Sequence, residues 1–357
     1  MKKKDLLDLY SEYLLSSFGP ATATGLSRMM DGEISHDQVT RFLAETGKQS
    51  ADLWMIAKPH VRKIQSEDGV LIVDDSIEEK PYTDENDIIC WHYDYSKGRQ
   101  VKGVNFMTAL YQSKGVILPV GFQLVAKTEH YVDKKTGRES RRSPVEKNEY
   151  CRRLIEQAVK NQVPFRYVLF DVWYASAQNM IFIKHEARRD FICPIKTNRK
   201  VALSVEGQHH GQYHRVDTLE LEENTVRGIY LEGVDFPLEL VKQTFVNEDG
   251  STGVLYLVTS DTTHSYHEIT MIYRKRWSVE YYHKSLKQNV SLEKSPAKTV
   301  TTQTNHFFAA LCGFIKLEML KINTKLNHFA LKTKLYMNAL HTAFLSLQQL
   351  NPVQLTA

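Results

Sequence analysis

The sequence contains few cysteines and no long apolar segment, and these absences exclude several classes of protein. The cysteines stand singly and form no CxxC motif; they are Cys90, Cys151, Cys193 and Cys312. A zinc site and a disulfide framework are therefore not indicated, and a reducing, cytoplasmic compartment is expected. No apolar run approaches about 18 residues, so no membrane span is predicted. The charged start of the chain leads into a mixed segment, so no signal peptide is predicted either.

A strong net charge is also missing. The 46 basic and 42 acidic residues leave a formal net charge of +4, which is too small to indicate a polyanionic partner by itself. The charge is unevenly distributed, however, because residues 273–298 hold many Lys and Arg side chains against only Glu280 and Glu293. A local basic surface of this kind suits nucleic acid. The hydrophobic fraction of 42% is ordinary for folded globular domains.

The first part of the chain, residues 1–68, has a helical pattern. Helices are predicted at 21–30 and 35–44, joined by a tight turn that contains glycine. The second helix begins with a capping box, S-x-x-Q. This arrangement is compatible with a DNA-reading helix-turn-helix in which Gln38 and Arg41 face the bases. A plain helical hairpin explains the same residues equally well.

The next part, residues 69–196, mixes strands and helices. Residues 69–73 form an apolar, β-branched run typical of a buried strand, and this strand is predicted to end at Asp74 and Asp75. Strands at 101–111 and 115–125 complete a predicted antiparallel meander. The other predicted elements are a helix that opens with the capping sequence 143–146 and ends near 161, a buried strand 167–170 that ends at Asp171, a helix 175–185 and a strand 191–195.

Residues 197–262 show no helical period and are predicted to form an all-β insertion. Four strands are expected, at 213–221, 226–231, 238–246 and 253–258. A turn at 247–250 is a hairpin signal between the last two. The remainder, 264–349, is predicted to be helical.

The stretch YRKRWSVEYYHKSLKQ, residues 273–288, places one acid among basic and aromatic side chains. At about 100° per residue, Glu280 shares a helical face with basic and aromatic residues. These are Tyr273, Arg276, Lys284 and Lys287, with Trp277 at the edge. A solvated helix face with a Glu280–Lys284 ion pair is the simple interpretation.

The aspartates suggest a different role for that acid. Asp171 and the Asp74-Asp75 pair each follow an apolar strand, and Glu280 is a third carboxylate on a helix. Three such groups can converge on divalent cations, and hard oxygen ligands suit Mg²⁺ or Mn²⁺. Two such ions can activate a water or a 3′-hydroxyl for attack on a phosphodiester. We therefore predict that Glu280 is a metal ligand whose basic neighbours hold DNA.

These residues resemble a family. The helix matches Y-x2-R-x3-E-x6-K, the signature of a group of bacterial insertion-sequence DDE transposases of the cut-and-paste type, and the segments LIVDDS and YVLFDVWY resemble the sequences around its two catalytic aspartates. The resemblance covers roughly residues 69–320. It implies a Mg²⁺- or Mn²⁺-dependent enzyme with two ions, held by the catalytic residues Asp74, Asp171 and Glu280. The family pattern Asp-x-Thr/Ser favours Asp74 together with Ser76, and Asp75 is the alternative.

The resemblance also implies DNA contacts. It makes Tyr273, Arg276 and Lys287 phosphate contacts near the cleaved end, and Lys284 also matches the family's best-studied members. Trp277 is a candidate for holding a flipped base, as aromatic residues do in members that form a DNA hairpin, and a packing role against the insertion is equally open. The expected partners are double-stranded DNA, as terminal inverted repeats and target, and a second copy of the chain in a synaptic homodimer. Association with the bacterial nucleoid would follow.

The expected fold is α/β: a ribonuclease-H-like catalytic domain with an all-β insertion, a helical N-terminal DNA-binding region and a helical C-terminus. The predicted boundaries are 1–68 for the DNA-binding region, 69–196 with 263–300 for the catalytic domain, 197–262 for the insertion and 301–357 for the C-terminal region. Two other functions remain open. One is a structure-specific nuclease or resolvase of the same fold, and the other is a DNA-binding regulator whose carboxylates are structural.

Overall fold

The computed structural model describes residues 3–134, 137, 139–246 and 249–350, and the chain divides into two compact units. The larger unit is Gln49–Tyr281, and the smaller one joins Met1–Lys48 to Tyr282–Ala357. In the described part of the chain, no helix combines the length and apolar character needed to cross a bilayer.

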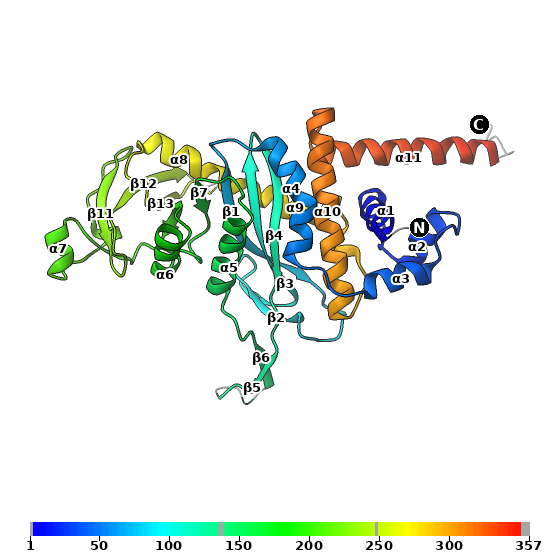
Figure 1. Cartoon of the computed structure of the whole chain (residues 1–357), viewed down its shortest axis with the longest axis horizontal. Coiled ribbons are helices and arrows are strands. Elements are labelled where there is room, and N and C mark those ends of the chain that lie inside the picture. The colour runs from blue at the N-terminus through cyan, green and yellow to red at the C-terminus, as the bar shows by residue number, and fades with distance from the viewer. Residues whose placement is uncertain (1–2, 135–136, 138, 247–248, 351–357) are drawn as a thin grey trace. The chain divides into compact units, whose positions relative to one another are not determined.

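Among the described residues of the larger unit, eleven strands form one mixed sheet (Figure 1). In chain order the strands are β1 (Val70–Glu79), β2 (Ile89–Asp94), β3 (Arg99–Ser113), β4 (Val116–Leu124), β7 (Tyr167–Leu169), β8 (Asp190–Ile195), β9 (Lys200–Ala202), β10 (His214–Arg215), β11 (Arg227–Leu231), β12 (Leu238–Val246) and β13 (Thr252–Thr259). A separate pair, β5 (Glu129–Val132) and β6 (Glu139–Arg142), forms a small antiparallel hairpin.

The direction of the strands determines which ends meet. The order across the sheet is β10-β9-β11-β12-β13-β8-β7-β1-β3-β2, with β4 also paired to β3. The β1–β7 and β7–β8 pairs are parallel, and the other pairs are antiparallel. Because β1 and β2 both run antiparallel to β3, they point the same way. β1, β2, β7 and β8 therefore all point the same way, although β7 ends opposite Ile72 while β1 continues to Glu79.

The first strand is longer than predicted. It does not end at Asp74-Asp75 but continues to Glu79, because β3 pairs with it from Val70 to Glu79. An acidic pair interrupts the apolar pattern without interrupting backbone pairing, and the neighbouring strand supplies the hydrogen bonds that keep the chain extended. The predicted meander is confirmed by the β1–β3 and β3–β4 pairs. The sequence reading missed β2, which pairs with the first half of β3.

The helices of the larger unit agree with the prediction only in part. They are α4 (Ser50–Ile64), α5 (Lys147–Lys160), α6 (Ala177–Ile181) with the π-helical turn Phe182–Glu186, α7 (Val205–His209) and α8 (Tyr266–Arg274). The predicted cap at 143–146 is wrong, since α5 begins only at Lys147. Ser143 Oγ instead accepts the N–H of Val145 in a local turn (3.3 Å), and Glu146 becomes the N-cap residue.

The segment predicted as an all-β insertion is not wholly β. Five strands, β9 to β13, arise from residues 200–259, and the short helix α7 lies between β9 and β10. The predicted strand 213–221 is wrong beyond β10, because a 3₁₀ turn at Val216–Thr218 follows it. Ser204 caps α7 by accepting the N–H of Gly207 (3.0 Å), a local signal that the absence of a helical period conceals. The predicted hairpin of β12 and β13 is present, while residues 247–248 of its predicted turn lie outside the described residues.

The smaller unit is helical. It contains α1 (Lys3–Ser16), α2 (Ala23–Met29), α3 (His36–Ala44), α10 (Val300–Thr324), α11 (His328–Leu350) and the end of α9 (Ser278–Asn289), whose start belongs to the larger unit. The predicted capping box is confirmed, because Ser35 and Gln38 exchange side-chain and backbone hydrogen bonds. Residues 305–308 are buried, and the Tyr10 hydroxyl lies 3.0 Å from His306 Nδ1. Most of α11 is exposed.

Candidate active site

Strand register brings Asp74 and Asp171 together. Ile72 of β1 pairs with Leu169 of the parallel strand β7, and each aspartate lies two residues further along its own chain. Burial raises the pKa of Asp74 to about 8, helped by the negative charges of Asp171 and Asp75 and opposed by the guanidinium of Arg276. Burial also raises the pKa of Asp171. The two carboxylates therefore share a region in which negative charge is incompletely balanced.

Asp75 has a different environment. Neighbouring residues of a strand point to opposite faces of the sheet, so Asp75 faces away from Asp74. Its carboxylate accepts hydrogen bonds from Lys147 Nζ (2.6 Å), from Asn105 Nδ2 (2.8 Å) and from the hydroxyl of Tyr174. Burial works to raise its pKa, but these partners outweigh burial and hold the pKa below its ordinary value. Groups of the protein thus already balance the charge of Asp75.

Arg276 connects Asp74 to Glu280. Its Nη1 lies 4.0 Å from Asp74 Oδ2 and 3.9 Å from Glu280 Oε1. The guanidinium also lies over two aromatic rings, 5.8 Å from the centroid of Tyr273 and 5.4 Å from that of Trp277. Only 12% of the Arg276 side chain is exposed, whereas 59% of the Glu280 side chain is exposed. Arg276 therefore lies close to Asp74 and Asp171, and Glu280 lies beside it on the solvent side.

The helix that carries Glu280 is not regular. A 3₁₀ turn at Lys275–Trp277 separates α8 from α9, so the spacing of about 100° per residue does not hold across it. Tyr273, expected on the charged face, is 5% exposed and packs beside Arg276. Val279, Tyr282 and Leu286 form the core face of α9 and are fully buried, whereas Ile272 of α8 is half-buried.

The remaining predicted DNA-binding residues belong to the smaller unit. Lys287 forms an ion pair with Glu293 (3.6 Å), and Lys284 Nζ lies 5.3 Å from the ring centroid of Phe329. On α3, Gln38 and Arg41 are exposed. Gln38 Oε1 accepts the N–H of Ser35 at 2.8 Å, so its amide already has a structural role.

The acids provide only oxygen donors, which suit Mg²⁺ or Mn²⁺. In the described part of the chain, no group of three or more His, Cys, Asp or Glu side chains is close enough to hold a metal ion. Asp74 and Asp171 nevertheless fit a cation, because burial and mutual repulsion leave their charge incompletely balanced. Arg276 lies where a positive charge is favoured, between Asp74 and Glu280.

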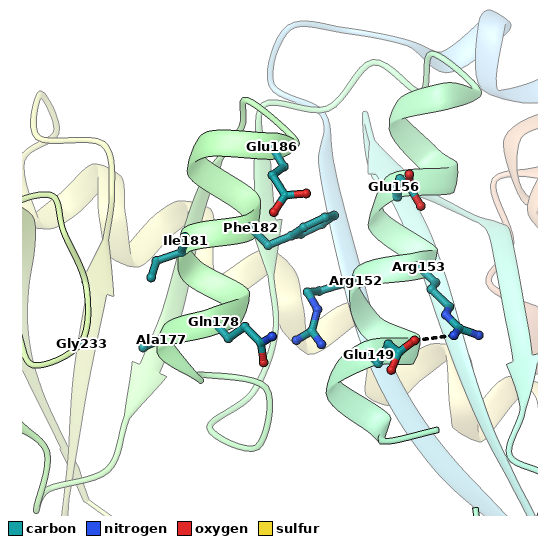
Figure 2. A pocket seen from close by; sticks show the side chains of 10 residues that line it. All are labelled: Glu149, Arg152, Arg153, Glu156, Ala177, Gln178, Ile181, Phe182, Glu186 and Gly233. Atoms are coloured by element: carbon teal, nitrogen blue, oxygen red, sulfur yellow. Dashed lines mark hydrogen bonds and ion pairs between the residues drawn. The ribbon is translucent and has the colours of Figure 1, made fainter. Parts of the chain in front are cut away.

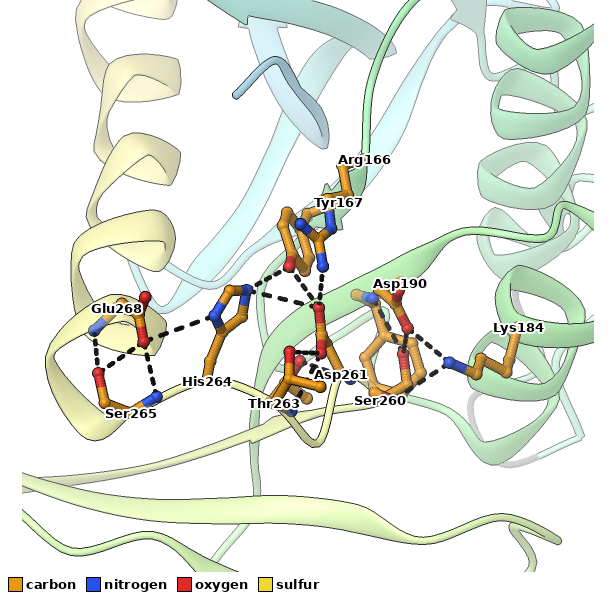
Figure 3. Close-up of polar contacts among 12 residues, drawn as sticks. Arg166, Tyr167, Lys184, Asp190, Ser260, Asp261, Thr263, His264, Ser265 and Glu268 are labelled. Atoms are coloured by element: carbon orange, nitrogen blue, oxygen red, sulfur yellow. Dashed lines mark hydrogen bonds and ion pairs between the residues drawn. The ribbon is translucent and has the colours of Figure 1, made fainter. Parts of the chain in front are cut away.

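A polar network that the sequence did not predict lies at the start of β7 (Figure 3). Asp261, which follows β13, accepts hydrogen bonds from Arg166 Nη2 (2.7 Å), from the Tyr167 hydroxyl (2.5 Å) and from Thr263 Oγ1 (2.6 Å). His264 also contacts Tyr167 and Asp261. Hydrogen bonds outweigh burial and hold the pKa of Asp261 well below its ordinary value. The network joins the start of β7 to the segment that enters α8.

A cavity of about 520 Å³ lies elsewhere in the larger unit, between α5 and α6 with its π-helical turn (Figure 2). Its lining includes an ion pair between Arg153 and Glu149. Arg152, also in the lining, donates to Asn179 Oδ1 at 2.7 Å. The predicted catalytic acids do not line this cavity. The candidate site is therefore distinct from it.

Lys147 is the partner that sequence reasoning could not find. It lies 72 positions from Asp75 and has no motif of its own. Its contact with Asp75 depends on α5 packing against β1, β3 and β4, which only the fold reveals.

Comparison with known families agrees with this geometry. Residues 2–215 match the family described as DDE superfamily endonuclease, and residues 143–313 match the family described as transposase DDE domain. No curated protein matches the chain. Because the first match spans more than half of the sequence, the protein belongs to the DDE superfamily of endonucleases and transposases, which act on DNA.

Proposed function

We propose that the protein is a transposase of an insertion sequence. It binds the terminal inverted repeats of its element, cleaves DNA at the element ends and joins the freed 3′-hydroxyl to target DNA. The observation that carries this proposal is the convergence of Asp74, Asp171 and Arg276 on one face of β1, with Glu280 next to Arg276. The signature Y-x2-R-x3-E-x6-K, which is finer than the family matches, supports it.

In this proposal Asp74, Asp171 and Glu280 hold two Mg²⁺ or Mn²⁺ ions. Such ions activate the attacking oxygen and stabilise the leaving oxygen of a phosphodiester. The unbalanced charge of Asp74 supports its assignment as the first acid, and the Lys147 contact of Asp75 argues against the alternative. Arg276 holds the Asp74 and Glu280 carboxylates near one another. Its position also allows it to contact a DNA phosphate at the solvent side.

The proposed DNA contacts come from both units. Tyr273, Arg276, Trp277, Lys284 and Lys287 are assigned to the cleaved end. Gln38 and Arg41 on α3 are assigned to base reading of the terminal repeat. The exposure of Trp277, 61%, supports a contact with a base more than a packing role.

The proposed domains keep the predicted boundaries. Residues 69–196 and 263–300 form a ribonuclease-H-like catalytic domain, 197–262 form its insertion, 1–68 bind DNA and 301–357 form the helical C-terminus. The mixed core β4-β3-β1-β7-β8, with its two parallel pairs, supports the catalytic assignment. A homodimer on paired ends is also proposed. The exposed apolar side chains of α11, among them Phe344 (58%) and Leu347 (61%), support such an interface.

The test begins with the DNA on either side of the gene, where short inverted repeats inside a direct duplication define the substrate. A labelled end of that repeat is incubated with the protein, Mg²⁺ and a supercoiled target. We expect cleavage at the repeat boundary and a joined product of repeat and target. Cleavage without any joined product would instead identify a nuclease or resolvase, and binding without cleavage would identify a regulator.

A further inference from the structure

Three aromatic side chains gather next to Asp171 and remain exposed. The ring centroid of Tyr95 lies 4.7 Å from that of Tyr93 and 4.2 Å from that of Trp173. Solvent reaches 45% of Tyr93, 62% of Tyr95 and 48% of Trp173. Single exposed aromatic residues are common, but a contiguous exposed cluster indicates a binding surface. We call these three residues the aromatic platform.

The platform lies beside Asp171. The backbone N–H of Trp173 donates to Asp171 Oδ1 at 2.9 Å, which places this residue directly beside a proposed catalytic carboxylate. Tyr93 belongs to β2, and Tyr95 follows its carboxyl end. β2 runs in the same direction as β1 and extends beyond it, because its last residue pairs with Arg99 whereas that of β1 pairs with Gly103. The contact between the rings of Tyr95 and Trp173 brings this end of β2 to the segment that follows Asp171.

Polar contacts hold the turn that presents the tyrosines. Asp94 Oδ1 accepts both the N–H (3.0 Å) and the hydroxyl (2.6 Å) of Ser96. Lys97 forms an ion pair with Glu79 at the end of β1, and Arg99 Nη2 lies 3.4 Å from Glu79 Oε2. The rings are therefore held in place before any ligand binds, which lowers the entropy cost of binding.

A cation completes the surface. Lys196, just after β8, places its Nζ 5.3 Å from the ring centroid of Trp173. Flat ring faces with an adjacent ammonium group suit a nucleotide, because the base stacks on a ring and the cation attracts the phosphate. In a duplex the faces of the bases are covered by neighbouring base pairs. An unpaired base leaves its face open to the rings.

We propose that the aromatic platform and Lys196 bind unpaired nucleotides of DNA beside the catalytic acids. This inference rests on the proposed function, since a strand opened or cut near Asp74 and Asp171 supplies such nucleotides. The site differs from the predicted role of Trp277, which belongs to the 3₁₀ turn before α9. The platform is formed by other segments, the β2–β3 turn and the segment after β7.

The test measures DNA binding by the full chain in EDTA, so that cleavage does not contribute. A fluorescent single-stranded oligothymidylate and a duplex of equal length are titrated separately. Trp173→Ala and Tyr95→Ala should each weaken single-strand binding about tenfold and duplex binding much less. Trp173→Phe, which keeps a ring, should restore most of the affinity. Bromodeoxyuridine in the single strand should photo-cross-link to Trp173 or Tyr95.

Tyr131 supplies a matched control. Its ring is 42% exposed and lies 5.7 Å from the guanidinium carbon of Arg142, so it also combines an exposed ring with a cation, in the β5–β6 hairpin. Tyr131→Ala should leave single-strand affinity unchanged. An equal loss in Tyr131→Ala and Tyr95→Ala would overturn the proposed location. If the platform variants lose affinity equally for single-stranded and duplex DNA, or lose none, the proposal that unpaired bases stack on these rings is contradicted.

The outcome is separable from that of the proposed function. If the platform residues are needed to bind oligothymidylate but the protein cleaves no DNA, the platform proposal is supported and the transposase proposal is contradicted. If the protein cleaves and joins DNA with metal but Trp173→Ala binds oligothymidylate as the wild type does, the transposase proposal is supported and the platform proposal is contradicted. Thermal unfolding of each variant establishes that it is folded, which is expected because the substituted rings are exposed.

Discussion

The guanidinium of Arg276 lies between Asp74 and Glu280, with Nη1 4.0 Å from one carboxylate and 3.9 Å from the other. Asp74 belongs to β1, and Glu280 to the first turn of α9, more than two hundred positions later. The side chain of Arg276 thus connects α9, which carries Glu280, to β1, which carries Asp74. The aromatic rings of Tyr273 and Trp277 pack against the guanidinium and restrict its position.

Replacing Asp74 should stabilise the metal-free protein. Its pKa is raised to about 8 on folding, above the ordinary value of about 3.9. A carboxyl group of this kind destabilises the folded state increasingly as pH rises between these two values. Asp74→Asn should therefore raise the free energy of unfolding on the order of 2 kcal/mol near neutral pH, and by little near pH 4. Urea unfolding in EDTA at the two pH values measures this.

The adjacent residue provides the control, because Asp75 has the opposite electrostatics. Its pKa is lowered in the folded protein by Lys147 and its other partners. Asp75→Asn should lower the free energy of unfolding by about 2 kcal/mol, the loss of a charged hydrogen bond. Shifts of the same sign in Asp74→Asn and Asp75→Asn would contradict this difference between the two acids.

Activity should depend on Asp74, Asp171 and Glu280 but not on Asp75. Asp74→Asn, Asp171→Asn and Glu280→Gln should each abolish Mg²⁺-dependent cleavage while DNA binding persists, since phosphate contacts come from other residues. Mg²⁺ should also raise the melting temperature of the wild type and not that of Asp74→Asn, because only a ligand that binds the folded state stabilises it. An inactive Asp75→Asn beside an active Asp74→Asn would reverse the assignment.

Arg276→Ala should weaken binding of the cleaved end and reduce the salt dependence of binding by about one unit, the loss of one phosphate contact. Lys287→Ala should behave similarly. Arg274→Ala is the control, because this residue is exposed at the end of α8. Lys275 is unsuitable, since its Nζ donates to the backbone oxygen of Asp68 (2.7 Å) and its loss would disturb the fold. A slope that falls equally in Arg274→Ala would mean that total charge alone matters.

Base reading by α3 can be separated from its stability. Arg41→Ala should lower discrimination between the terminal repeat and random DNA by about 1–3 kcal/mol. Gln38→Ala should have the same effect and also remove the capping box, whereas Gln38→Glu keeps a capping residue at that position. Competition binding with the two DNAs measures discrimination. Unchanged discrimination in a folded Arg41→Ala would make α2 and α3 a structural hairpin.

The Asp261 network should stabilise the larger unit above acidic pH. Because hydrogen bonds hold the pKa of Asp261 well below its ordinary value, its contribution is complete above the unfolded value of about 3.9 and is lost as pH falls towards the folded value. Asp261→Asn should lower the free energy of unfolding by about 2 kcal/mol at neutral pH. It should also weaken the fall in stability on acidification. Glu220→Gln, an acid-to-amide change at an exposed residue outside this network, is the control and should alter neither quantity.

Local patterns predicted the elements whose causes are local. The capping box of α3 and the strands at 101–111 and 115–125 are present as expected. The end of β1 was misplaced because pairing with β3, not residue type, keeps the chain extended beyond Asp75. The start of α5 was misplaced because Ser143 caps a turn instead of a helix.

The candidate site was predictable as a set of acids but not as an arrangement. The motif identified Glu280 and Arg276, and the family pattern favoured Asp74. Nothing local distinguishes Asp74 from Asp75, because both are aspartates in one strand. The difference arises from Lys147 and Arg276, which approach β1 from opposite faces and from distant parts of the chain.

The alternation of Asp74 and Asp75 also has a consequence for folding fidelity. A slip of β1 by one residue against its neighbours would turn every side chain to the other face. Asp75 would then lose its contact with Lys147 and face Asp171. Asp74 would face α5 on the opposite side of the sheet. The Asp75–Lys147 ion pair forms only in the native register of β1 and therefore stabilises that register over the shifted one during folding, before DNA binds.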